Sequence, residues 1–195
     1  MAALPDNAVH PATLAEWRAW LAANHLRDGG VWLVIWKKAS GKQVFTFDDA
    51  IEEALCFGWI DSRPGKLDAG RTMLWFAPRK PGSGWSRINK ERVAKVSAEG
   101  RMTAAGQAVI DASKADGSWA MLDAVENLEI PEDLAAAFDR HPPSRAHFEA
   151  FPRSAKRGIL EWIVQAKRPE TRAGRIEETA RLAKENIRAN QWPRR

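Results

Sequence analysis

The sequence contains no tyrosine and a single cysteine, Cys56. A single cysteine excludes an internal disulfide, so the fold cannot depend on a covalent cross-link. No stretch approaches the roughly 18 uncharged apolar residues that a membrane-spanning helix requires. The N-terminal segment also lacks the basic start and apolar run of a secretory signal, so we expect a cytoplasmic location.

Most of the standard chemical motifs are missing as well. The four histidines are scattered, there is no second cysteine, and neither a nucleophile elbow nor a nucleotide-binding glycine motif is present. We therefore predict no catalytic residue, no metal site and no cofactor.

Tryptophan, by contrast, is abundant, with ten copies among 195 residues. Indole rings bury large areas and carry one N–H donor, so they either fill a core or form a platform on which ligands stack. The sequence alone leaves both interpretations open.

Charge is unevenly distributed along a chain whose net charge is +5. Residues 61–101 carry ten basic and four acidic side chains, and residues 153–195 carry twelve and five. Between them, residues 102–152 carry three basic and nine acidic side chains. The basic blocks either fold against the acidic block or form a surface for an anionic partner.

Hydrophobic periodicity predicts strands only in the first half of the chain and helices in both halves. The strands are expected at 31–38, 59–63 and 71–78. The helices are expected to begin near residues 11, 46, 86, 103, 131, 144, 154 and 169. This order indicates an α+β fold, with a small antiparallel sheet and packed helices in 1–122. An all-helical subdomain is expected at 123–195, packed on the first as one compact unit.

The stretch CFGWIDSRPGK, residues 56–66, places Trp59, Asp61 and Arg63 on one face of a predicted strand. Arg71, on the next strand, is expected to face them across the hairpin. A carboxylate between two guanidinium groups is typical of an ion-pair network. The alternative is an enzyme with a pocket around Trp59 and Asp61.

Basic and aromatic residues are interleaved in the segment 71–92. This mixture suits single-stranded nucleic acid, where bases stack on indoles and cations follow the phosphates. It suits an anionic ligand or a protein partner equally well. The candidate binding residues are therefore Trp59, Asp61, Arg63, Arg71, Trp75, Arg79, Lys80, Trp85, Arg87 and Lys90.

Four segments resemble the YdeI/OmpD-associated family, bacterial proteins also described as bacteriocin-protection proteins. They are EEALCFGWIDS (52–62), FAPRKPGSGWSRINKERV (76–93), EGRMTAAG (99–106) and ILEWIVQAKRPETRAGRIEETARLA (159–183). The likeness is expected to extend from about Trp17 to Ala183. It implies a non-enzymatic role in tolerance of cationic antimicrobial peptides or envelope stress, exercised by binding a porin or another envelope-related protein. The resemblance implies no catalytic residue and no cofactor.

Overall fold

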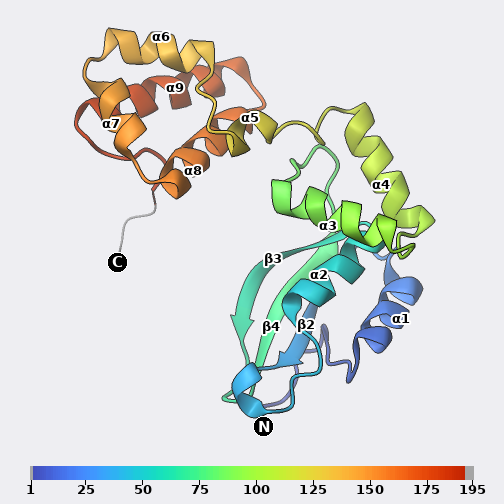
Figure 1. The fold of residues 1–195 in the computed structure, drawn as a ribbon. Helices are drawn as coiled ribbons and strands as arrows, with labels where there is room; N and C mark the ends of the chain where they lie inside the picture. Colours follow the sequence, from blue (N-terminus) through green and yellow to red (C-terminus); the bar gives the residue numbers. More distant parts are fainter. Residues whose placement is uncertain (1, 192–195) are drawn as a thin grey trace. The chain divides into compact units, whose positions relative to one another are not determined.

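The computed structural model describes residues 2–191 and confirms the α+β fold, with the sheet in the N-terminal half and only helices beyond it (Figure 1). Contacts between residues group the chain into two compact units. The first unit comprises Met1–Ser83 and Ile88–Trp119, and the second comprises Gly84–Arg87 and Ala120–Arg195. The short segment 84–87 therefore interrupts the first unit.

The sheet of the first unit has four strands in the order β1-β2-β4-β3. They are β1 (Ala8–Val9), β2 (Val31–Trp36), β3 (Trp59–Lys66) and β4 (Arg71–Pro78). Strands β2, β4 and β3 pair antiparallel, but β1 runs parallel to β2. The sheet is thus mixed, and the prediction of a purely antiparallel sheet is wrong at this edge. A two-residue strand has too little periodicity to be recognised in the sequence.

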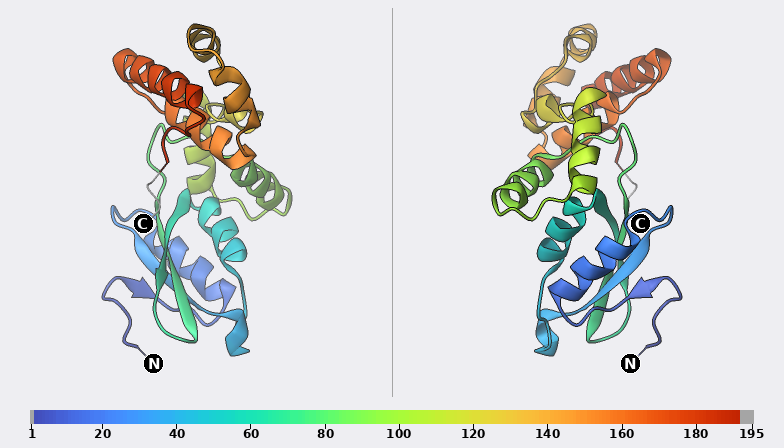
Figure 2. Two further views of the ribbon diagram at one scale, coloured as in Figure 1. Left: turned by 90° about the vertical axis from the view of Figure 1, so that its left-hand side faces the viewer. Right: turned by 90° about the vertical axis from the view of Figure 1, so that its right-hand side faces the viewer.

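Helices α1 (Leu14–Asn24) and α2 (Phe47–Cys56) lie on the same side of the sheet (Figure 2). Thr46 caps α2 where its start is predicted, and Thr13 caps α1 two residues after the predicted start, each accepting a hydrogen bond from a backbone N–H in the first turn. The indole of Trp17 packs edge-on against Phe76 of β4, and its Nε1 donates to the Ala50 carbonyl oxygen of α2 at 3.1 Å. This face of the sheet is therefore the core of the first unit.

The first unit also contains the short 3-10 helix η1 (Lys38–Ser40), α3 (Arg87–Ala98) and α4 (Ala104–Ala115). Helix α4 begins at the predicted cap, where the Thr103 hydroxyl accepts from the Gly106 N–H. The same hydroxyl donates to the Cys56 carbonyl oxygen at 2.5 Å, which attaches the start of α4 to the end of α2.

The second unit is built from five helices among the described residues: α5 (Asp123–Glu126), α6 (Glu132–Arg140), α7 (Ser144–Ala150), α8 (Arg153–Val164) and α9 (Pro169–Lys184). Phe138 and Phe148 contact each other at its centre, with ring centroids 5.1 Å apart. Ile159, Ile163 and Ala180 are buried around them. Among the described residues, no helix is both long and apolar enough to span a membrane.

Candidate functional site

The face of the sheet opposite α1 and α2 carries three tryptophans, and we call it the Trp face. Its members are Trp32, Val34 and Trp36 of β2, Arg71, Met73 and Trp75 of β4, and Arg63 of β3. The tryptophans and Met73 are partly exposed and Arg63 is exposed, whereas Val34 and Arg71 are buried. These residues follow directly from strand alternation, because Leu33, Leu74 and Phe76 point to the helix-covered side.

A β-bulge places Arg63 on the Trp face. Asp61 pairs with Phe76 and Pro64 pairs with Leu74, so two residues, Ser62 and Arg63, stand opposite Trp75 alone. Without the bulge, alternation would put Arg63 on the same side as Asp61. The prediction that Asp61 and Arg63 share a face is therefore wrong. The adjacent Pro64 was the available signal, since proline within a strand marks an edge or a bulge.

The Arg63 guanidinium lies over two indole rings at once. Its carbon is 5.2 Å from the centroid of Trp32 and 5.1 Å from that of Trp75, and the two rings meet edge-to-face. Gly65 makes room for this arrangement, because a Cβ there would lie 2.7 Å from Met73 and 3.0 Å from the Trp32 ring. Cation–π attraction therefore holds a charged group on an aromatic surface.

Trp36 forms a second aromatic and cationic centre at the far end of β2. The Lys42 ammonium lies 4.9 Å from its ring centroid, Arg71 lies 5.9 Å away, and the His10 ring is 5.4 Å away. Burial, followed by the charge of Arg71, lowers the pKa of His10, so this imidazole is neutral at physiological pH.

Arg71 forms an ion pair with Asp68 and not with Asp61. Its Nε and Nη2 donate to one Asp68 oxygen at 3.0 and 2.7 Å, and Nη2 also reaches the Ala2 carbonyl oxygen. These bonds from Arg71 hold the pKa of Asp68 well below its usual range. The predicted Asp61–Arg71 contact across the hairpin is therefore wrong, because a partner three residues away in the turn takes the guanidinium.

Asp61 lies on the helix-covered side, partly buried and opposite Phe76. Among the described residues, no other side chain donates a hydrogen bond to it, and its carboxylate accepts from its own backbone N–H. Burial raises the pKa of Asp61, and the charge of Arg92 offsets this only in part. Arg92 itself is bound to Asp48 at 2.5 Å and to Asn89 at 2.9 Å.

Two predicted stacking residues are unavailable to a ligand, because Trp59 and Trp85 are each 1% exposed. Trp59 packs edge-on against Trp20 of α1 and donates its Nε1 to the His25 carbonyl oxygen at 2.9 Å. It is therefore a core residue and does not line a pocket.

The remaining basic candidates of 71–92 have different contacts. Arg79 is directed to Ser83, and burial lowers its pKa to about 10. Lys80 is exposed, and Lys90 lies over the Trp119 ring at 5.3 Å. Arg87 belongs to the second unit, where its Nη2 donates to Asn127 at 2.6 Å. The interleaving of basic and aromatic residues in 71–92 thus does not give one set of shared contacts, and ligand binding by these candidates stays a prediction.

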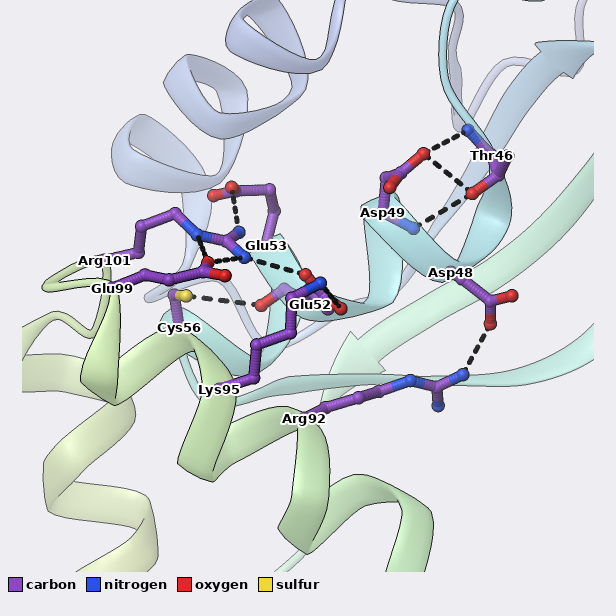
Figure 3. A network of polar contacts seen from close by, with 10 residues as sticks. All are labelled: Thr46, Asp48, Asp49, Glu52, Glu53, Cys56, Arg92, Lys95, Glu99 and Arg101. Atoms are coloured by element: carbon purple, nitrogen blue, oxygen red, sulfur yellow. Dashed lines mark hydrogen bonds and ion pairs between the residues drawn. The ribbon is translucent and has the colours of Figure 1, made fainter.

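The paired carboxylates of α2 are part of a closed network (Figure 3). Arg101 donates to Glu53 and to Glu52 at 2.7 Å each, and Lys95 reaches the other Glu52 oxygen at 2.7 Å. Arg18 of α1 binds the second Glu53 oxygen at 2.5 Å. All four carboxylate oxygens are paired, so the network is a clamp between helices and offers no free base.

Cys56 lies beside this clamp with its thiol directed to the Glu52 carbonyl oxygen (Figure 3). Burial and then the charge of Glu53 raise the pKa of this thiol, so it is a poor nucleophile. In the described part of the chain, no group of three or more histidine, cysteine or acidic side chains is arranged to hold a metal ion.

The second unit carries a groove of about 630 Å³ between α6 and α9. Ala136, Ala173 and Ile176 are among its apolar lining. Two ion pairs join its walls: Arg172 holds Asp133 with contacts of 2.7 and 3.0 Å, and Arg140 holds Glu177 at 3.1 Å. Sequence reasoning missed this groove, because residues 37 and 39 positions apart meet only in the folded unit.

Two family models match different parts of the chain. The model described as "Bacteriocin-protection, YdeI or OmpD-Associated" matches residues 127–186, and a model described as a domain of unknown function, DUF8412, matches residues 9–109. No curated protein and no solved structure matches the chain.

The predicted resemblance is thus confirmed, but over a shorter range than expected. Of the four segments on which it rested, only 159–183 lies within 127–186, and the other three lie within 9–109. The chain therefore belongs to the DUF8412 family through residues 9–109, more than half of its length, and its residues 127–186 are similar to the bacteriocin-protection, YdeI or OmpD-associated family.

Proposed function

We propose that this protein protects bacterial cells against cationic antimicrobial peptides by binding a protein partner through the groove between α6 and α9. The proposal rests on the position of the groove in the sequence. Every residue that lines the groove, from Asp133 to Glu177, lies within the segment that matches the bacteriocin-protection family. A porin or another envelope-related protein is the partner that the family description favours.

The composition of the groove suits a helical or extended peptide segment. Ala136 and Ala173 are small, exposed lining residues that let a partner backbone approach closely, and Ile176 supplies an apolar contact. Each ion pair on the walls places a cation beside an anion, so the rim offers donors and acceptors to polar groups of the partner. Binding, and not catalysis, is the activity proposed for this unit.

The test is survival of a peptide-sensitive bacterial host that expresses the full chain, measured during exposure to a cationic peptide such as polymyxin B. Ala173→Trp fills the groove without removing either ion pair, and its large side chain should block the partner. Ala150→Trp is the matched control, because Ala150 is exposed at the end of α7.

We expect protection by the wild type and by Ala150→Trp, and loss of protection with Ala173→Trp at an unchanged unfolding midpoint. Equal protection by both variants would show that the groove is not the contact. A wild type that gives no protection would overturn the proposed function itself.

A further inference from the structure

We propose that the Trp face of the first unit binds single-stranded nucleic acid, with Arg63 on a phosphate and the indoles of Trp32 and Trp75 against bases. This inference is independent of the proposed function, because it concerns other residues in the other unit. Of the candidate residues in segment 71–92 it keeps Trp75, and it adds Trp32 of β2.

Arg63 is an unpaired cation within the described part of the chain. Among the described residues, the guanidinium of Arg63 makes no ion pair with a carboxylate, and its contacts are the two indole rings. A guanidinium carries five N–H donors in a planar fork that matches the geometry of a phosphate. Lys42 over Trp36 likewise has no carboxylate partner in the described chain.

The same combination of indole and cation is repeated along one strand. Trp32 and Trp36 are four residues apart on β2, which corresponds to about 13 Å. Each has a cation within about 5 Å of its ring, Arg63 in one case and Lys42 in the other. A strand of a few nucleotides presents bases and phosphates alternately over such a distance, and aromatic stacking with phosphate tracking is how such strands are bound without sequence preference.

The partly exposed indoles also discriminate between competing polyanions. A duplex hides the faces of its bases, so it can use the cations but cannot stack on the indoles. An acidic peptide can pair with Arg63 and Lys42 but has no planar rings for Trp32 and Trp75. With a sequence pI of about 9.6, the protein is positively charged at neutral pH and attracts single strands, duplexes and acidic peptides alike. The partly exposed indoles therefore determine which of these three ligands binds most tightly.

The test is fluorescence anisotropy of a short fluorescein-labelled oligothymidine, titrated with the full chain at low and increasing salt. We expect Trp75→Ala to weaken binding about 5- to 150-fold, the range for loss of one stacked base. Arg63→Ala should weaken it as well and should reduce the slope of log affinity against log salt by about 0.7, the share of one phosphate on a single strand.

The matched control is Lys167→Ala, which removes the same charge from an exposed position in the second unit. Its affinity should stay within about twofold of the wild type, since one charge outside the site contributes little at moderate salt. An equal loss with Lys167→Ala and Arg63→Ala would show that overall charge alone attracts the strand, which overturns the proposal.

Two further ligands separate the alternatives. An oligoglutamate peptide and a duplex of the same length should both bind more weakly than the single strand. Equal or tighter binding of either, or no binding of oligothymidine at low salt, contradicts the proposal. If Trp75→Ala lowers the unfolding midpoint, Trp75→Phe is used in its place, because it preserves an aromatic ring. We expect the affinity of Trp75→Phe to lie between those of the wild type and Trp75→Ala. Wild-type affinity in both variants would refute stacking on Trp75.

Discussion

Removing Arg101 should destabilise the first unit far more than removing an arginine from an exposed ion pair. Arg101 donates to Glu53, whose side chain is 5% exposed, and to Glu52, whose side chain is 12% exposed. A hydrogen bond between charged groups is worth about 1.5–3 kcal/mol, and each carboxylate retains one other cation. We therefore expect Arg101→Met to lower the free energy of unfolding by about 3 kcal/mol.

The matched control is Arg145→Met in α7. Arg145 pairs with Glu149 at 3.1 Å, but both side chains are more than half exposed. Such a surface pair contributes less than about 0.5 kcal/mol. Urea unfolding followed by tryptophan fluorescence measures both variants, and circular dichroism shows whether the two units unfold together.

The effect should also depend on pH in a defined direction. Burial raises the pKa of Glu52, but the hydrogen bonds from Lys95 and Arg101 outweigh it and leave that pKa below the ordinary 4.5. Because the folded pKa is depressed, this stabilisation is present above pH 4.5 and is lost as the pH falls through the folded pKa. The difference between wild type and Arg101→Met should therefore be largest near neutral pH and shrink in acid.

A double variant that combines Glu52→Gln with Arg101→Met tests whether the destabilisation comes from the unpaired carboxylate charge. If the cost arises from leaving buried carboxylates with too few cations, the double variant should lose less than the sum of the two single variants. The reasoning would be refuted if Arg101→Met lowered the free energy of unfolding by no more than Arg145→Met does. It would also be refuted if the loss were the same at neutral and acid pH.

Two further predictions concern single positions. Gly106→Ala should lower the free energy of unfolding by about 2 kcal/mol, because its Cβ would clash with the Cys56 carbonyl. Gly174→Ala in α9 is the control, because a Cβ there meets nothing within 4 Å. It should raise the free energy of unfolding by about 0.5–1 kcal/mol in the same urea experiment. Burial raises the pKa of Asp61, so the ionised form opposes folding once the pH rises through the folded pKa. Asp61→Asn should therefore raise the urea midpoint near neutral pH and not in acid, and a midpoint change no different from that of the exposed Asp28→Asn would contradict this.

Local signals in the sequence predicted most of the secondary structure. The caps at Thr13, Thr46 and Thr103 and the apolar run of β2 depend on nearest neighbours, so they are visible without tertiary information. The run VWLVIW predicts a strand apolar on both faces, and the structure adds that its Trp32 and Trp36 remain partly exposed. Whether a second layer covers a sheet face is decided by the rest of the chain.

The site was predicted less well, because it depends on one irregularity and on distant contacts. Strict alternation from Trp59 places Arg63 beside Asp61, but the bulge at Ser62 and Arg63 moves it to the other face. Arg63 and Trp75 were both candidates but were not expected to meet, and Trp32, which contacts both, was not among the candidates. Trp85 shows the opposite error, since an aromatic residue among cations in the sequence is buried in the fold.

The path of the chain between the two units determines which variants can test the groove and the Trp face separately. The chain leaves the first unit at Gly84, returns at Ile88 and leaves again at Ala120, so no single cut separates the two units. Gly84 fits closely against Leu122, where a Cβ would lie 2.8 Å from a side-chain carbon, so the segment 84–87 has its place in the second unit. A chain truncated after Trp119 would keep this segment but lose its surroundings, including Asn127, the partner of Arg87. The groove and the Trp face should therefore be distinguished by point variants of the full chain, because truncation would disturb both at once.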